Sequence, residues 1–432
     1  MAVGPSKLTL RAYGVGFGDC FLLTFSYAGA TGDRHMLIDF GTTQKPPNPR
    51  KLLMMDIAKD IVATVGGHLH VIVATHRHTD HISGFATNAK KNGTGDLIAS
   101  LKPDLVIQPW TEDLNAPIKS KGPGRGLTAA ANDAFRLSLR HMQTVMVASL
   151  RQTRHLPTAL REEIAFVGQN DLSNLSAVKN LAKMGNNGKS AYVFYDKKIP
   201  KLAALLPNVQ VDVMGPPTIK QKADVVSQSA KNTQEYWHFA SVWGLRAATS
   251  ELTDGRELFP RAPVHTGRAI PIENRWFMQR LKQTRGNQLL RIVRAMDNAL
   301  NNTSVILLIK AGKKKLLFPG DAQWENWEHA LKKNASELTD VDVYKVGHHG
   351  SLNATPKTLW NAFTKKSASE GTKDRLCSVM STRTDSKHGH RESGTEVPRD
   401  KLVNALRSDS ELRSTQELEP TGDLVLKLEF DL

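Results

Sequence analysis

Alternating hydrophobic and polar positions near the start of the chain predict β-strands. Runs of this kind occur at 8–15, 21–27 and 35–41, separated by glycine-rich turns. The spacing of Leu, Met and Ile over 50–65 predicts a helix. Two further short apolar runs, at 69–76 and 104–110, predict two more strands. The first part of the chain therefore predicts a sheet with helices beside it.

The pattern changes twice further along the chain. Residues 112–183 look helical, with Leu127–Leu150 and Pro157–Met184 as candidate helices, and residues 218–295 form a second insertion. Strand patterns return between them, within 184–217, and strands alternate with helices over 296–432. We expect 1–111 and 296–432 to be the two halves of one core. This arrangement predicts an α/β fold, a four-layer αβ/βα sandwich with helical insertions.

The segment His76-Arg77-His78-Thr79-Asp80-His81 is the strongest chemical signal. It follows an apolar strand run and precedes a helix, so its side chains can converge on one turn. Imidazole nitrogens and a carboxylate oxygen suit zinc, and also manganese. The two cysteines, Cys20 and Cys377, form no CxxC pair, so histidines and carboxylates have to hold any metal.

Three further chain segments place polar residues just after predicted strands. Asp39 ends the run HMLIDFG, Asp321 ends KKLLFPGD, and His348 and His349 end VYKVGHHGS. Open-sheet proteins assemble their sites at such strand ends. Neither a G-x-S-x-G nor a Walker A sequence occurs, which argues against serine hydrolases and P-loop NTPases.

Together these segments resemble the metallo-β-lactamase superfamily, and within it the hydrolase module of the DNA-uptake protein ComEC. The resemblance covers about half of the chain, residues 1–110 and 301–390. Five segments carry it, namely VGFGDCFLL at 15–23, LIDFG at 37–41, THRHTDHISG at 75–84, NNTSVILLI to LLFPGD at 301–321, and VGHHGS at 346–351.

The resemblance implies two divalent metal ions, with Zn2+ expected first and Mn2+ as the alternative. His76 and His78 would bind one ion, Asp80 and His81 the other, and Asp321 would bridge them. His349 would complete the second site, and His348 would contact substrate or protonate the leaving group, although the two could exchange roles. Asp39 would orient the ligands.

One departure from the superfamily leaves a gap in the expected ligand set. Many members place another histidine before the strand that leads to the bridging aspartate, whereas this chain has Asn301-Asn302-Thr303-Ser304. The ComEC-like subgroup shares that departure. Asn302, a water molecule or substrate could fill the gap, and so could His388 or His390 from a loop that otherwise is simply basic.

The formal net charge of +16 is concentrated in two segments. Between Lys119 and Arg154 there are seven basic residues against one acid, and between Asn274 and Met296 six against none. Such segments suit a nucleic-acid backbone, although solvated helix faces would look the same. The residues expected to bind nucleic acid are Arg136, Arg140, Arg280 and Arg285.

The favoured hypothesis is a metal-dependent phosphodiesterase acting on nucleic acid. The alternatives are a hydrolase of a small phosphoester, cyclic nucleotide or other small ester, and a non-catalytic metal-binding component of a larger assembly. No apolar stretch is long enough to span a bilayer, and the N-terminus lacks the apolar core of a signal peptide. We therefore expect a cytoplasmic protein with no membrane partner.

Overall fold

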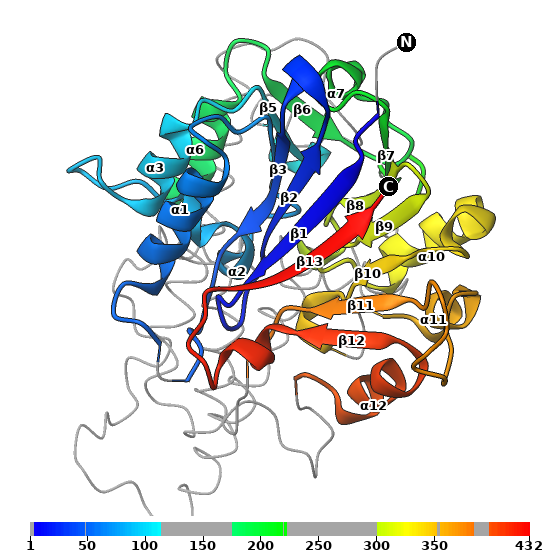
Figure 1. The fold of residues 1–432 in the computed structure, drawn as a ribbon. Helices are drawn as coiled ribbons and strands as arrows, with labels where there is room; N and C mark the ends of the chain where they lie inside the picture. The colour runs from blue at the N-terminus through cyan, green and yellow to red at the C-terminus, as the bar shows by residue number, and fades with distance from the viewer. Residues whose placement is uncertain are drawn as a thin grey trace, which may run out of the picture.

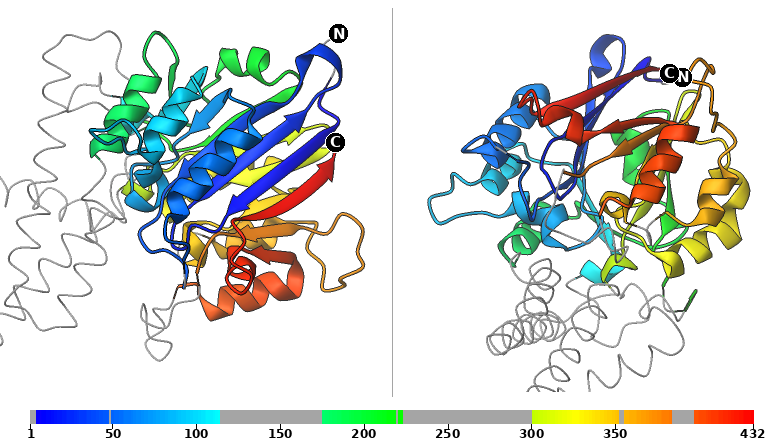
Figure 2. Two further views of the ribbon diagram at one scale, coloured as in Figure 1. Left: turned by 60° about the vertical axis from the view of Figure 1, so that its left-hand side comes forward. Right: turned by 90° about the horizontal axis from the view of Figure 1, so that it is seen from below.

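The computed structural model describes residues 4–47, 49–113, 175–218, 220–222, 300–351, 355–383 and 397–432. Over these residues the chain builds two β-sheets that pack face to face, with helices on their outer faces (Figures 1 and 2). The expected α/β fold class is confirmed. The candidate helix at 127–150, most of that at 157–184, and nearly all of the second insertion lie outside the described residues.

The first sheet has seven strands and joins the two ends of the described chain. In order across the sheet they are β13 (Val425–Asp431), β1 (Lys7–Tyr13), β2 (Cys20–Ser26), β3 (Arg34–Phe40), β4 (Val71–Val73), β5 (Leu105–Pro109) and β6 (Ser190–Val193). Pairing is antiparallel from β13 to β3 and parallel from β3 to β6.

The second sheet has six strands. In order they are β12 (Glu411–Ser414), β11 (Cys377–Met380), β10 (Val343–Lys345), β9 (Lys314–Phe318), β8 (Ile306–Ala311) and β7 (Val209–Gly215). Pairing is parallel from β12 to β9 and antiparallel from β9 to β7. The parallel strands of each sheet end at one edge of the sandwich, and this is where the polar segments lie (Figure 1).

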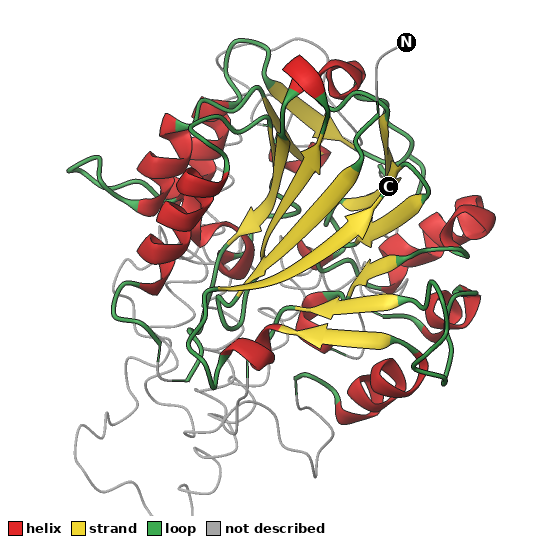
Figure 3. Ribbon diagram, viewed as in Figure 1, coloured by secondary structure: helices red, strands yellow, loops and turns green. Residues whose placement is uncertain are grey.

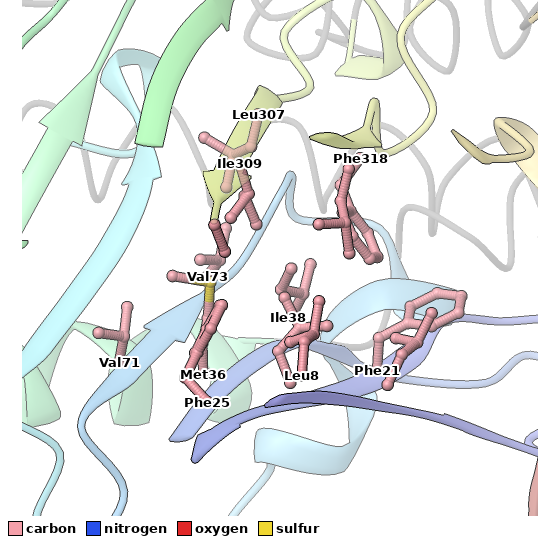
Figure 4. Close-up of a cluster of buried hydrophobic side chains, with 14 of the residues drawn as sticks. Leu8, Phe21, Phe25, Met36, Ile38, Val71, Val73, Leu307, Ile309 and Phe318 are labelled. Carbon is pink, nitrogen blue, oxygen red and sulfur yellow. The ribbon is translucent and has the colours of Figure 1, made fainter. Parts of the chain in front are cut away.

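Buried apolar side chains form three clusters, which fill the spaces between the layers. Between the sheets, Leu8 and Ile38 of the first sheet face Leu307 of the second, and the rings of Phe21 and Phe318 meet edge to face at 5.7 Å (Figure 4). A second cluster lies under the helices on the first sheet, and a third under those on the second. The order of layers is therefore helix, sheet, sheet, helix.

The outer helices present apolar faces at helical spacing. In α1, for example, Leu53, Ile57 and Ile61 are buried at every fourth position. The helices on the first sheet are α1 (Leu53–Thr64), α3 (Thr94–Ser100) and α6 (Leu175–Met184); those on the second are α10 (Trp324–Asn334), α11 (Lys357–Ala362) and α12 (Asp400–Asp409). The short helices α2 (Thr79–Ile82) and α7 (Pro200–Leu205) are the other α-helices among the described residues (Figure 3). None of the helices in the described residues has the length and apolar character needed to cross a membrane.

Candidate metal centre

The histidine-rich segment runs from the loop after β4 into the short helix α2. His78 caps α2, and its carbonyl accepts hydrogen bonds from the backbone N–H groups of His81 and Ile82. His76, His78, Asp80 and His81 are all buried. The rings of His76 and His81 lie 4.1 Å apart, centroid to centroid, so the turn gathers its polar side chains on one side.

Two groups of side chains at this edge could each hold a metal ion. One consists of Asp80, His81, Asp321 and His349, and the other of His76, His78 and Asp80. Within each group the possible ligand atoms lie within 4.8 Å of one another. The structure therefore brings all six predicted ligands together, with Asp80 common to both groups. A third group, Asp19, Asp39 and His81, also meets this distance.

Several buried ligand atoms lack hydrogen-bond partners within the described chain. They include His76 Nε2, Asp80 Oδ1 and Asp321 Oδ2. Buried polar atoms of this kind are costly unless something satisfies them. Imidazole nitrogens and carboxylate oxygens are the donor set of zinc and related divalent ions. The residues present therefore fit a bound metal ion.

Asp39, which the sequence analysis expects to orient the ligands, contacts both His81 and the residue before the histidine turn. Its Oδ1 accepts a hydrogen bond from the Thr75 backbone N–H at 2.7 Å, and its Oδ2 accepts one from the Thr75 hydroxyl at 2.7 Å. The same Oδ2 lies 2.7 Å from His81 Nδ1. A hydrogen bond at Nδ1 leaves Nε2 of His81 directed at Asp321 Oδ2, 3.0 Å away.

The adjacent histidines His348 and His349 differ in their surroundings. His349 is buried, its Nδ1 donates to the Ser381 carbonyl at 3.1 Å, and its Nε2 lies 3.1 Å from Asp80 Oδ2. The His348 side chain is 24% exposed, and its Nε2 lies 3.8 Å from Asp321 Oδ2. This placement favours His349 as the ligand and leaves His348 at the solvent-accessible side.

Two buried residues of the centre were not predicted from sequence, Asp19 and Lys345. They form an ion pair with each other, and the Lys345 ammonium also donates to the Gly320 carbonyl at 3.2 Å. Asp19 stands in the glycine-rich segment after β1, and its backbone N–H donates to the Asp80 carbonyl at 2.9 Å. The only sequence signals were the Gly-Asp pair at 18–19 and a lysine within an apolar strand.

Close backbone packing holds the histidine turn against the end of β3. A Cβ atom on Gly41 would lie 2.5 Å from the carbonyl carbon of Asp80 and from the amide nitrogen of His81. Real Cβ atoms do not approach so closely, so only glycine lets the two segments touch here. This contact sets the position of two of the six ligands.

The charges within the centre hold its carboxylates ionised. Burial alone raises the pKa values of Asp80 and Asp321, but the neighbouring histidines, His81 first among them, together outweigh burial and lower both pKa values below their ordinary range. Burial alone lowers the pKa of His81, but the surrounding carboxylates, Asp321 and Asp39 first, together outweigh burial and raise that pKa well above the ordinary value. Ionised carboxylates are the form that binds metal.

The other predicted residues have mixed outcomes. Asn302 is buried, and its amide nitrogen donates to Glu325 Oε2 at 2.8 Å, a partner that sequence reasoning missed. Glu325 lies in the first turn of the amphipathic helix α10, and nothing in that sequence pattern singled it out. The remaining residues lie outside the described chain: His388, His390, Arg136, Arg140, Arg280 and Arg285.

Comparison with known proteins adds no relative to this picture. No protein-family model matches the chain, and no curated protein matches it significantly. We therefore infer a function from the residues of the centre and from their geometry.

Proposed function

We propose that this centre binds two divalent metal ions, with zinc the first choice, and that the protein is a metal-dependent phosphodiesterase acting on nucleic acid. The observation that carries the proposal is the pair of ligand groups sharing Asp80. One group offers four buried ligands and the other three, which matches two neighbouring cations better than one. The metallo-β-lactamase fold is part of the same proposal, and the helix–sheet–sheet–helix layering supports it.

Bound cations would supply a water of lowered pKa as nucleophile and would neutralise charge on the phosphoryl group. The chain's own residues do the rest. Asp39 and the Ser381 carbonyl hold His81 and His349 by their Nδ1 atoms, which keeps the Nε2 atoms in the centre. The His348 side chain is partly exposed and its Nε2 lies 3.8 Å from Asp321 Oδ2, so that it can give a proton to a departing oxygen.

Charge supports nucleic acid as the substrate over a small ester. The formal net charge is +16, and the two most basic segments fall in the insertions. A polyanion would be attracted by such segments, because each neutralised phosphate releases counterions. The ComEC-like sequence resemblance favours the same substrate class. A small-ester hydrolase would use the same metal ligands and has no need for long cationic segments.

The test is hydrolysis by the metal-loaded protein. Labelled DNA, labelled RNA and bis-p-nitrophenyl phosphate are each incubated with it, with and without chelator. We expect cleavage of a nucleic acid and of the small diester, abolished by chelator and by Asp80→Ala. Cleavage of the small diester alone would favour the small-substrate alternative. A metal-loaded protein that cleaves nothing would favour the non-catalytic component.

A further inference from the structure

Lys345 is a buried cation placed inside the candidate metal centre. It is the last residue of β10, and only 2% of its side chain is exposed. Lysine is almost never fully buried without a partner, because removing an ammonium from water is costly. Its ion-pair partner is Asp19, and its Nζ also lies 3.7 Å from Asp321 Oδ1.

Asp19 connects Lys345 to two predicted ligands. Its Oδ2 lies 3.6 Å from His81 Nδ1, and its Oδ1 lies 3.6 Å from His349 Nδ1. Both imidazoles belong to the same ligand group. The carboxylate thus lies on the Nδ1 side of both rings, opposite the nitrogens that would bind metal. The Nδ1 atoms themselves bond to Asp39 and to the Ser381 carbonyl, so the Asp19 carboxylate, 3.6 Å away, acts on both rings through its negative charge.

Asp321 is held in one orientation by its neighbours on the Lys345 side. Its Oδ1 accepts a hydrogen bond from the His348 backbone N–H at 3.1 Å and faces the Lys345 ammonium. Its Oδ2 has no hydrogen-bond partner and points to His81 Nε2. One oxygen is therefore turned toward the protein, and the other is left for a metal.

We propose that Lys345 is a positioning residue for the group of Asp80, His81, Asp321 and His349. It fixes the Asp19 carboxylate on the Nδ1 side of the two imidazoles. It also turns Asp321 so that only its Oδ2 faces the other residues of the group. It also neutralises Asp19, which belongs to the third group of possible ligands. This inference rests on the metal binding proposed above.

The test compares metal binding in matched variants of the full chain. Lys345→Met removes the ammonium and keeps an unbranched chain, Asp19→Asn neutralises its partner, and the double variant removes both charges. Tyr344→Phe is the control, because Tyr344 is one residue away, lies in the third apolar cluster, and loses only a buried hydroxyl that bonds to Thr355. Three quantities are measured: the stability of the metal-free protein, metal affinity by chelator competition, and the visible spectrum of the Co2+-loaded protein.

We expect Lys345→Met and Asp19→Asn each to weaken metal binding about ten- to a hundredfold, the range seen when partners of ligands are removed. The Co2+ spectrum should change in both, because ligand orientation changes. The double variant should bind metal no more weakly than the single variant with the lower metal affinity, since both substitutions act through one ion pair. Tyr344→Phe should keep the parent's affinity and spectrum even where its stability falls.

A Lys345→Met protein with the parent's affinity and Co2+ spectrum would overturn the proposal, whatever its stability. Should that variant fail to fold, the double variant, which has no unpaired buried charge, is read in the same way. The proposal of phosphodiesterase activity has a separate test, because it is contradicted when the metal-loaded parent cleaves no substrate. A parent that binds no metal would overturn both proposals.

Discussion

A pair of buried histidines at the opposite end of β3 and β4 from the metal centre should make stability depend on pH. His35 and His70 are 4% and 5% exposed. The His35 backbone N–H donates to His70 Nδ1 at 3.1 Å, and the Arg34 guanidinium lies 2.8 Å from His70 Nε2. Because Nδ1 of His70 accepts a hydrogen bond, a second proton on the ring would displace that bond and would place a positive charge beside Arg34. Burial, with Arg34 adding to it, lowers the pKa of His70 to about 4, and burial lowers that of His35 to about 4.

The direction of the effect follows from proton binding. An unfolded histidine has a pKa of about 6.5 and takes up a proton at a pH where the folded one does not. The unfolded state therefore binds more protons between about pH 6.5 and pH 4, and the free energy of unfolding falls as the pH is lowered through this window. A shift from 6.5 to about 4 corresponds to roughly 3 kcal/mol per histidine at pH 4.

The assay is urea denaturation of the parent and of a His35→Gln/His70→Gln variant from pH 7.5 to pH 4, in chelator. The variant should lose stability at neutral pH, because its packing is disturbed. Its stability should nevertheless fall less steeply with acid than that of the parent, by several kcal/mol over the range. Every other titrating group is common to both proteins. Parallel curves for parent and variant would refute the reasoning.

Three further predictions concern the centre and the basic segments. Gly41→Ala should lower the free energy of unfolding by about 1–3 kcal/mol and weaken metal binding, because the new Cβ atom would clash with the Asp80 backbone. Urea denaturation measures the stability and chelator competition the metal affinity. An unchanged metal affinity would contradict the second expectation. His348→Ala should keep its metals and lower kcat, whereas His349→Ala should lose metal; elemental analysis and steady-state kinetics separate them, and the reverse result would exchange their roles. Replacing four arginines with alanine should make the affinity for nucleic acid depend less steeply on salt; they are Arg136, Arg140, Arg280 and Arg285. Fluorescence anisotropy measures this slope, and an unchanged slope would show that these arginines do not bind nucleic acid.

The ligand set could be predicted from sequence, because its members follow apolar runs that can be recognised in short stretches of the chain. Asp39 and Asp321 each end such a run, and the turn at His76 follows one directly. Parallel strands then bring their ends to one edge. A local pattern is sufficient for this part of the site.

The ion pair of Asp19 with Lys345 could not be predicted, because it joins segments distant in the chain through tertiary packing. Nothing in either segment indicates which partner the buried charge meets. Strand β12 could not be predicted either, because its sequence, ELRS, has no apolar alternation and its place depends on pairing with β11. The insertions expected at 112–183 and 218–295 stay predictions wherever their residues lie outside the described chain.

The most direct test of the central claim is the metal content of the purified protein. Elemental analysis after loading with zinc and gel filtration should give close to two ions per chain, because two ligand groups share Asp80. Asp321→Ala, which removes a buried ligand, should hold fewer. A parent chain that stays free of metal after loading with zinc or manganese would contradict the claim that these residues form a metal centre.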